Sequence, residues 1–431
     1  MAAQGLQGRH ALPLNRRRFL QAAGTLTVSV WLPGRVHAAG TPHHVVIIGG
    51  GWGGLAAAHH LRQLAPALDV TLIERETRFW SMPLSNKWLV GQIDGHLLTH
   101  DYAAAARSRG YRFIQAEVSA IDRDRQRVSS SVGHVDYDWL VLSLGIQHDY
   151  TAWFGDDREK AELARRQFPA AYTPGTEFAT LRSKLQSFAG GDWLMTIPPA
   201  PFRCPPAPYE RAVLLAGWLE RNKVPGRIII IDPNPAFQEF QRIFRERYPQ
   251  RILYKSQTPI TAVDPVRRSV DTEFEEFSFA EATLMPPQQA GALAHQSGLV
   301  KNGWGDVEPL DLSARADPRI FMIGDMVGPV SGLFGHYPKT GQIAVRQGRI
   351  VARRIAALSH GKTVPVELPD SLCHITTAYD PPAAIRLAAS FRQRGDGELV
   401  QQNTVERDPQ PRGEDLAWLQ SLLGEMITAP Q

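Results

Sequence analysis

A glycine-rich turn, Gly49-Gly-Gly51-Trp-Gly-Gly54, constrains the fold of this chain more than any other feature of the sequence. It lies between an apolar run at 44–48, typical of a buried parallel strand, and a run at 55–61 that favours a helix. In this context Gly49 allows a tight turn, Gly51 lets the backbone approach a pyrophosphate, and Gly54 lets the helix and the strand pack closely. We therefore predict a dinucleotide site with phosphates facing the helix N-terminus.

The next strand supports this prediction. A second apolar run at 70–73 ends at Glu74, 25 residues after Gly49. A carboxylate at that position accepts hydrogen bonds from the hydroxyl groups of the adenosine ribose. A glycine-rich turn without a ligand is the alternative, and the strand–turn–helix context argues against it.

The far end of the chain distinguishes FAD from NAD. Gly324-Asp325 follows an apolar strand candidate at 319–323, as in two-dinucleotide-domain flavoproteins, whose aspartate holds the ribitol. Ser143-Leu-Gly145, after the strand candidate at 138–142, resembles the intervening loop of these proteins, which usually contains Thr-Gly. Because these elements occur in the expected order, we predict that the cofactor is FAD.

A second α/β unit begins in the middle of the chain. Its expected strands are 193–197 and 227–231, with a helix at 209–222 between them. The first of these strands leads into Pro198–Pro208, which has no glycine and is rich in residues without an N–H group. Such a segment cannot form the usual phosphate cradle, so we predict no nicotinamide site.

The predicted fold class is α/β, with two Rossmann-like three-layer dinucleotide-binding domains and a C-terminal α+β region. We expect an FAD-binding domain formed by 43–157 and 287–362. We expect a second Rossmann-like domain at 158–286 and a C-terminal domain at 363–431. Helices are expected at 340–358 and near 416–426.

The N-terminal segment resembles a twin-arginine export signal. Arg16-Arg17-Arg18-Phe-Leu precedes a short apolar stretch and a Val-His-Ala cleavage pattern that ends at Ala38. Residues 1–38 contain five arginines and no acidic residue, so their removal changes the formal charge from +4 to −1. The mature chain then gives no electrostatic reason to bind nucleic acid, and no apolar run is long enough to span a bilayer. We expect a periplasmic protein.

The chain has only two cysteines, Cys204 and Cys373. In an exported protein a cysteine pair is either a structural disulfide or a redox centre. A chain of this size can bury a sufficient core without a disulfide, which weakens the structural interpretation. The histidines show no metal-ligand spacing, and we predict no metal site.

Three segments together resemble one family. They are Ala200–Arg211, which contains Arg-Cys204-Pro-Pro, then Pro286-Pro-Gln288 with Ala290-Gly291, and Pro338-Lys-Thr-Gly341. The chain resembles the flavoprotein subunit of flavocytochrome c sulfide dehydrogenase from about 43 to 380. Sulfide:quinone oxidoreductases are more distant relatives.

The resemblance implies roles for individual residues. Cys204 and Cys373 match the redox cysteines of the family, and Glu210 matches a glutamate beside the flavin and the disulfide. A glutamate in the first turn of a helix often only complements the helix dipole, so both interpretations of Glu210 remain. Met82 stands where the family usually has the cysteine that binds FAD covalently, so we predict non-covalent FAD.

The predicted function is oxidation of sulfide, or of a related sulfur compound, through a Cys204–Cys373 disulfide and FAD. Because the chain lacks Cys-x-x-Cys-His, the haem acceptor must be a c-type cytochrome on another polypeptide. The alternatives are a flavin oxidoreductase that uses quinone or another acceptor or substrate, and a non-catalytic flavoprotein partner.

Overall fold

The computed structural model describes residues 43–173 and 175–427. The predicted export signal at 1–38 lies outside the described residues. Within the described part, no helix combines the length and the apolar character that crossing a membrane requires. The described residues form one compact unit by their contacts, so the domain boundaries given above stay predictions.

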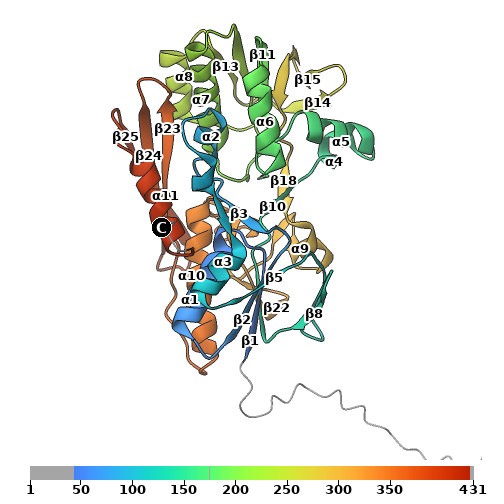
Figure 1. Cartoon of the computed structure of the whole chain (residues 1–431), viewed down its shortest axis with the longest axis vertical. Coiled ribbons are helices and arrows are strands. Elements are labelled where there is room, and N and C mark those ends of the chain that lie inside the picture. Colours follow the sequence, from blue (N-terminus) through green and yellow to red (C-terminus); the bar gives the residue numbers. More distant parts are fainter. Residues whose placement is uncertain (1–42, 174, 428–431) are drawn as a thin grey trace, which may run out of the picture. The chain divides into compact units, whose positions relative to one another are not determined.

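A six-stranded sheet carries the glycine-rich turn and lies in the lower part of Figure 1. β1 is central, with β2 on one side and β9 on the other, and these neighbours pair in parallel. Their central residues are mostly apolar and buried, as is typical of a parallel sheet with helices on both faces. In spatial order the strands are β21 (Ser313–Ala314), β22 (Asp317–Met322), β9 (Trp139–Leu142), β1 (His44–Ile48), β2 (Asp69–Glu74) and β5 (Arg112–Gln115).

Two long helices pack together beside this sheet, α1 (Trp52–Leu64) and α10 (Gly341–Leu358). Their close approach requires glycine, because a Cβ atom on Gly348 would lie 2.5 Å from the carbonyl oxygen of Gly53. Because β22 pairs with β9 and α10 packs against α1, residues 317–358 complete the first α/β layer.

The second sheet, in the upper part of Figure 1, has four parallel strands. In spatial order they are β13 (Ile252–Lys255), β12 (Gly226–Ile231), β11 (Gly191–Thr196) and β17 (Glu281–Thr283). Helix α7 (Ala207–Arg221) connects β11 with β12 and is buried along most of its length. The expected second Rossmann-like unit is present.

A three-stranded antiparallel sheet follows, formed by β23 (Ser371–Ala378), β24 (Ala383–Gln393) and β25 (Leu399–Asp408). β23 packs against both α7 and α11 (Glu414–Gly424). The sequence predicted an α+β region and the last helix, but not this sheet. Each strand and helix that the sequence did predict is present, with its ends shifted by at most a few residues.

Short elements connect these layers. The remaining strands are β3 (Arg78–Trp80), β4 (Thr99–Asp101), β6 (Val118–Asp122), β7 (Arg127–Ser130), β8 (Gly133–Asp136), β10 (Ile146–His148), β14 (Ile260–Asp264), β15 (Ser269–Thr272), β16 (Glu276–Ser278), β18 (Gln288–Ala290), β19 (Val300–Lys301) and β20 (Trp304–Gly305). The remaining helices are α2 (Ser85–Leu89), η1 (Gly95–Leu98), α3 (Tyr102–Arg109), α4 (Thr151–Phe154), α5 (Arg158–Gln167), α6 (Thr176–Ser187), α8 (Gln238–Arg247), α9 (Ala292–Gln296) and η2 (Gly324–Met326).

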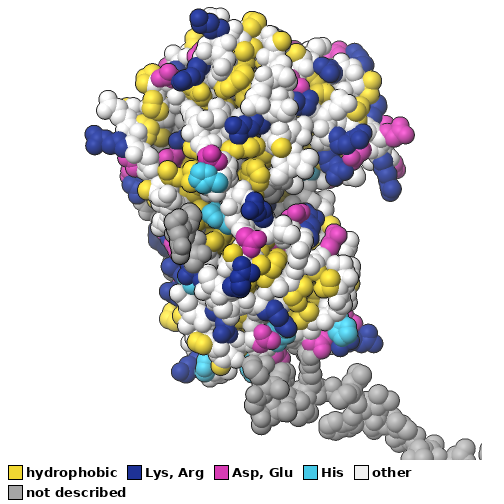
Figure 2. All heavy atoms as spheres, in the orientation of Figure 1, with side chains coloured by type: hydrophobic (Ala, Val, Ile, Leu, Met, Phe, Trp, Pro, Cys, Tyr) yellow, Lys and Arg dark blue, Asp and Glu magenta, His cyan; other side chains and the backbone are white. Residues whose placement is uncertain are grey.

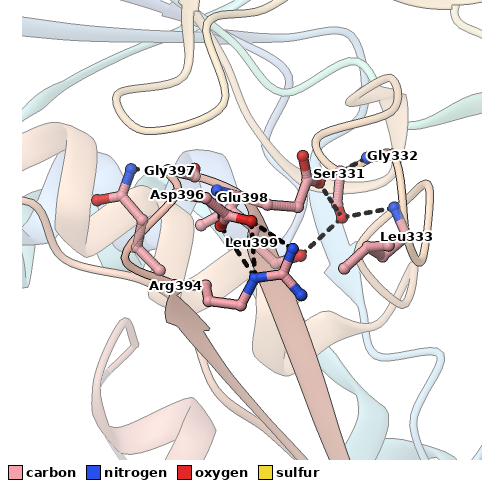
Figure 3. A network of polar contacts seen from close by, with 9 residues as sticks. Ser331, Gly332, Leu333, Arg394, Asp396, Gly397, Glu398 and Leu399 are labelled. Carbon is pink, nitrogen blue, oxygen red and sulfur yellow. Dashed lines mark hydrogen bonds and ion pairs between the residues drawn. The ribbon is translucent and has the colours of Figure 1, made fainter.

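Polar contacts fasten the β24–β25 hairpin to a surface turn (Figure 3). Ser331 Oγ lies 2.8 Å from Glu398 Oε1, and the Gly332 N–H donates to the same oxygen across 2.8 Å. A cavity of about 520 Å³ lies beside this contact. The described residues that line it are Glu308, Pro309, Leu310, Asp311, Val330, Gly397, Glu398 and Leu399, and none belongs to the predicted site.

On the face drawn in Figure 2, Lys and Arg side chains are mixed with Asp and Glu and do not gather into one basic patch.

Candidate active site

The glycine-rich turn has the geometry that its spacing predicts. Gly49 has a φ of +97°, and a Cβ atom there would lie 2.3 Å from the Ser143 carbonyl oxygen. A Cβ on Gly54 would lie 1.9 Å from the Gly49 carbonyl oxygen. At Gly51 a Cβ would meet only Ser143 Oγ, at 4.0 Å. Gly49 and Gly54 are therefore required for packing, while the space beside Gly51 is open to a ligand at the N-terminus of α1.

The predicted ribose ligand lies at this turn. Glu74 ends β2, and its Oε2 accepts the Gly50 N–H across 2.8 Å. Tyr102, which the sequence analysis did not identify, donates its hydroxyl to the Gly50 carbonyl oxygen across 2.8 Å. The backbone of the turn is thus held from two sides, with the carboxylate beside it.

The other predicted cofactor residues lie at the same edge of the sheet. Gly145 follows β9 and Gly324-Asp325 follows β22, and the carboxyl ends of parallel strands meet at one edge. Gly145 and Gly324 have φ values of +65° and +76°. The Gly324 N–H donates to Gln347 Oε1 of α10 across 2.7 Å. A glycine cradle with carboxylates at both ends fits FAD.

Cys204 lies in the proline-rich loop between β11 and α7, in the left-handed region with a φ of +48°. Its N–H donates to the Lys339 carbonyl oxygen across 2.8 Å, and its own carbonyl oxygen accepts the Ala207 N–H across 2.9 Å. The preceding Arg203 donates through Nε to Asp325 Oδ2 across 2.6 Å. These contacts join the cysteine loop to the candidate flavin site.

Cys373 lies on β23 and is buried. Burial raises the pKa of both thiols, that of Cys373 to about 11. The charge of Cys373 further raises the pKa of Cys204, so the two sulfurs lie within electrostatic range of each other. Both cysteines are free thiols in this structure, and the disulfide stays a prediction.

Glu210 joins the same group. It lies in the first turn of α7, is 8% exposed, and accepts hydrogen bonds from Asn86 Nδ2 and the Thr376 N–H, both at 2.8 Å. Its pKa is raised by burial, and its charge raises the pKa of both cysteines. Because its bonds go to α2 and β23, Glu210 does more than complement the dipole of α7.

Three further polar residues complete the site. Asn86 bonds both Glu210 and the buried Arg211. Lys339 is buried, and its Nζ donates to the carbonyl oxygens of Asp325 and Val327 and lies 3.7 Å from the centre of the Trp304 ring. Burial lowers the pKa of Lys339 to about 7. Arg211 and Lys339 were quoted above only as parts of the segments Ala200–Arg211 and Pro338–Gly341, and Asn86 was not identified in the sequence analysis.

Met82 lies in the loop between β3 and α2 and is partly buried. It packs against the apolar cluster that also contains Cys373 and Phe202. The position at which the resemblance places a flavin-linking cysteine is therefore next to the site, and it holds a thioether.

The end of β12 bears on the predicted absence of a nicotinamide site. Asp232 follows β12 and is fully buried, at the position where a Rossmann unit holds its ribose ligand. Its Oδ2 accepts the hydroxyls of Tyr209, across 2.6 Å, and of Tyr254, across 2.7 Å. Its Oδ1 accepts hydrogen bonds from Asn234. Side chains of the protein thus occupy the hydrogen-bonding capacity that a ribose would need.

Two family models match parts of this chain. Residues 43–166 match the pyridine nucleotide-disulphide oxidoreductase model. Residues 178–286 match the central region of the sulfide dehydrogenase [flavocytochrome c] flavoprotein chain. The second match includes the loop of Cys204 and the helix of Glu210.

Three curated relatives are named as quinone oxidoreductases or reductases. Mitochondrial sulfide:quinone oxidoreductase of Mus musculus is 24% identical over 78% of this chain and 76% of its own length. Sulfide-quinone reductase of Aquifex aeolicus is 34% identical over 24% of each chain. A type II NADH:quinone oxidoreductase of Staphylococcus haemolyticus is 24% identical over 74% of this chain and 83% of its own.

Solved structures show the fold. The sulfide:quinone oxidoreductase of Aquifex aeolicus superposes with a TM-score of 0.69 at 20% identity, covering 89% of this chain and 91% of that one. The putidaredoxin reductase–putidaredoxin complex gives a TM-score of 0.62 at 17% identity, with 89% and 93% covered. The α/β fold with Rossmann-like units is that of disulfide-reductase-type proteins. Together, the matches support an FAD-dependent oxidoreductase of the sulfide dehydrogenase and sulfide:quinone oxidoreductase type.

Proposed function

We propose that this protein is an exported FAD-dependent oxidoreductase that oxidises hydrosulfide, or a related sulfur compound, through a disulfide between Cys204 and Cys373. The observation that carries the proposal is that β23, which bears Cys373, packs against the segment of Cys204 and Glu210: the Thr376 N–H of β23 donates to Glu210 across 2.8 Å, and Cys373 and Glu210 both raise the pKa of Cys204. The link from the cysteine loop to Asp325 through Arg203 supports it further, because electrons must pass from sulfur to the cofactor site.

The chemistry of the cysteines follows from thiol–disulfide exchange. Hydrosulfide attacks one sulfur, the S–S bond breaks, one cysteine becomes a persulfide and the other leaves as a thiolate. The partial exposure of Cys204, against the burial of Cys373, favours attack on Cys204. A second hydrosulfide attacks the outer sulfur of the persulfide and releases hydrogen disulfide and a proton. The cysteines then re-form their disulfide and give up two electrons.

Two hydrosulfide ions thus yield one hydrogen disulfide ion, one proton and two electrons. When bound, FAD supplies the acceptor for the two electrons. The cradle at Gly51, with Glu74 and Asp325, would hold it. Met82 gives no thiol for a covalent link, so this binding is non-covalent.

In this proposal, Glu210 donates the proton to the leaving sulfur. Burial raises the pKa of both thiols, so a thiolate is a costly leaving group in this site. The pKa of the Glu210 carboxyl is itself raised by burial, so a protonated form is accessible to donate to the departing sulfur. We assign Glu210 the role of general acid, and of general base when the disulfide re-forms.

The electron acceptor is proposed to be a c-type cytochrome on a separate polypeptide in the periplasm. The match of 178–286 to the flavoprotein chain of a flavocytochrome c supports this acceptor. Quinone is the second candidate, favoured by relatives named as quinone oxidoreductases.

Anaerobic stopped-flow mixing of the holoprotein with sulfide tests the proposal. We expect bleaching of the flavin absorbance, and a loss of at least about 100-fold in its rate constant in Cys204→Ser and Cys373→Ser, with unfolding under reducing conditions unchanged. Reoxidation is then compared between a c-type cytochrome and a short-chain ubiquinone, and the faster acceptor decides between the two candidates.

Unchanged bleaching in both variants would overturn the redox role. If both variants keep the bleaching but are much less stable than the parent protein under oxidising conditions, the pair is a structural disulfide. Absence of bleaching in the parent protein would favour a non-catalytic flavoprotein partner.

A further inference from the structure

Asn86 uses both ends of its side-chain amide inside the candidate site. It lies on α2 and is 4% exposed. Its Nδ2 donates to Glu210 Oε2 across 2.8 Å and to the Ala207 carbonyl oxygen across 3.1 Å. Its Oδ1 accepts from Arg211 Nε across 3.1 Å. A buried amide with every contact satisfied has one orientation.

Arg211 determines that orientation. A guanidinium only donates hydrogen bonds, so the amide oxygen of Asn86 must face Arg211 and the amide nitrogen must face Glu210. Arg211 is 1% exposed and donates also to the Ala171 carbonyl oxygen across 3.0 Å. It cannot turn into solvent without leaving these acceptors unpaired, so it is a fixed anchor.

Glu210 is therefore held from two sides by different parts of the chain. Asn86 comes from the helix that follows the Met82 loop, and the Thr376 N–H comes from β23, three residues after Cys373. Each carboxylate oxygen has one of these donors. The loss of either would leave a buried carboxylate oxygen without a partner.

We propose that Asn86 is a positioning residue that, anchored by Arg211, holds the Glu210 carboxylate toward the two cysteines. The role of Glu210 rests on the proposed function, but its positioning does not. The charged and titratable groups that act with Glu210 are Lys87 on α2, Arg211 on its own helix, and the two cysteines.

The amide also sets how readily Glu210 ionises. Burial favours the protonated acid, and the hydrogen bonds from Asn86 and Thr376 favour the carboxylate. A residue that both donates and accepts a proton needs a pKa near the working pH, and these two opposing effects set the pKa of Glu210. Removing the Asn86 donor should leave Glu210 protonated to higher pH.

Asn86→Asp is the matched test, because it has the same shape and keeps an acceptor for Arg211. It removes the donor to Glu210 and adds a negative charge beside it. The readout is the infrared carbonyl band of a protonated carboxylic acid in the holoprotein, followed against pH and assigned by its loss in Glu210→Gln. Asn222→Asp, at the exposed end of α7, makes the same chemical change away from the site and serves as the control.

We expect the Glu210 band to persist to higher pH in Asn86→Asp and to keep its parent midpoint in Asn222→Asp. The pH limb of flavin reduction by sulfide should shift in the same direction, and Glu210→Gln should abolish that shift. An unmoved band in Asn86→Asp would overturn the proposal. Because the band is read without sulfide, failure of sulfide to reduce the flavin would count against the proposed function alone.

Discussion

The guanidinium of Arg203 donates to the carboxylate of Asp325 across 2.6 Å, and Arg203 is the residue immediately before Cys204. The candidate sulfur chemistry and the candidate cofactor site are therefore joined by one ion pair between distant segments. The side chains of Arg203 and Asp325 are only 21% and 14% exposed, so water screens the pair weakly.

Arg203→Gln should weaken both the cofactor site and the fold. We expect a loss of about 2 kcal/mol in the free energy of unfolding, because the carboxylate loses a charged donor in a mostly buried place. FAD retained through gel filtration should also fall. The control is Arg227→Gln, whose pair with Asp192 is half exposed on the arginine side and should cost less than about 1 kcal/mol. Equal losses in the two variants would contradict the link.

Gly49→Ala should abolish FAD binding. The new Cβ would lie 2.3 Å from the Ser143 carbonyl oxygen, and the φ of +97° is unfavourable for alanine. Gly91 also has a positive φ, +78°, but a Cβ there meets nothing within 4 Å. Gly91→Ala should therefore cost only about 1 kcal/mol and keep the flavin. Urea unfolding and the ratio of flavin to protein absorbance separate the two cases.

Acid should destabilise the protein below pH 6.5. Burial lowers the pKa of His59, His148 and His336 to about 4. Between pH 6.5 and about 4 the unfolded chain binds protons that the folded chain does not, so the stability present above pH 6.5 is lost as the pH falls through that window. His148 contributes up to about 3 kcal/mol to this loss.

His148→Gln, measured by urea unfolding at pH 7 and pH 5, should show a smaller loss between these values than the parent protein. The exposed His134, replaced in the same way, is the control. A pH dependence that is identical in the parent and in His148→Gln would refute the assignment to His148.

NAD(P)H should not reduce the flavin. The hydroxyls of Tyr209 and Tyr254 already bond the Asp232 carboxylate, which stands where a Rossmann unit would bind the ribose of NAD(P)H. Asp232→Asn weakens two short hydrogen bonds to a buried carboxylate and should cost about 2–3 kcal/mol of unfolding free energy. Tyr254→Phe removes one of the two bonds and should cost less. Flavin bleaching by NADH in the parent protein would show that the site is open.

Acid precipitation should release the flavin. Met82 offers no thiol, so FAD should appear free in the supernatant of the precipitated holoprotein. Met82→Cys, denatured in parallel, shows whether a thiol at this place can link the flavin. Flavin that stays in the pellet of the parent protein would mean that another residue forms a covalent bond.

The local elements could be predicted from the sequence because their signals are local. The apolar runs, the glycine spacing and Glu74 describe one strand–turn–helix unit, in which neighbours along the chain are neighbours in space. The Gly324-Asp325 turn and helix α10 could be predicted for the same reason. Asn86, Arg211 and Lys339 could not be assigned roles in this way, because their partners lie on other segments.

The three-stranded sheet at the C-terminus shows the same limit. β24 and β25 alternate weakly and lie partly exposed, so their residues carry little hydrophobic periodicity. Their pairing depends on β23, which is buried against α7. The sequence of this region predicted a mixed tail and no particular pairing.

The sequence by itself determined that this chain forms a glycine-rich dinucleotide turn and a proline-rich loop where a nicotinamide cradle would stand. Both follow from the stereochemistry of single residues and their immediate neighbours, whereas the interpretation of Met82 as replacing a flavin-linking cysteine came from the family resemblance. Only the tertiary structure decided that Cys373 lies within electrostatic range of Cys204 and Glu210, and that Asn86, anchored by Arg211, and the Thr376 N–H hold Glu210 between them. Such contacts arise when α2, α7 and β23 pack together, and burial in that packing is what shifts the acidity of the groups involved.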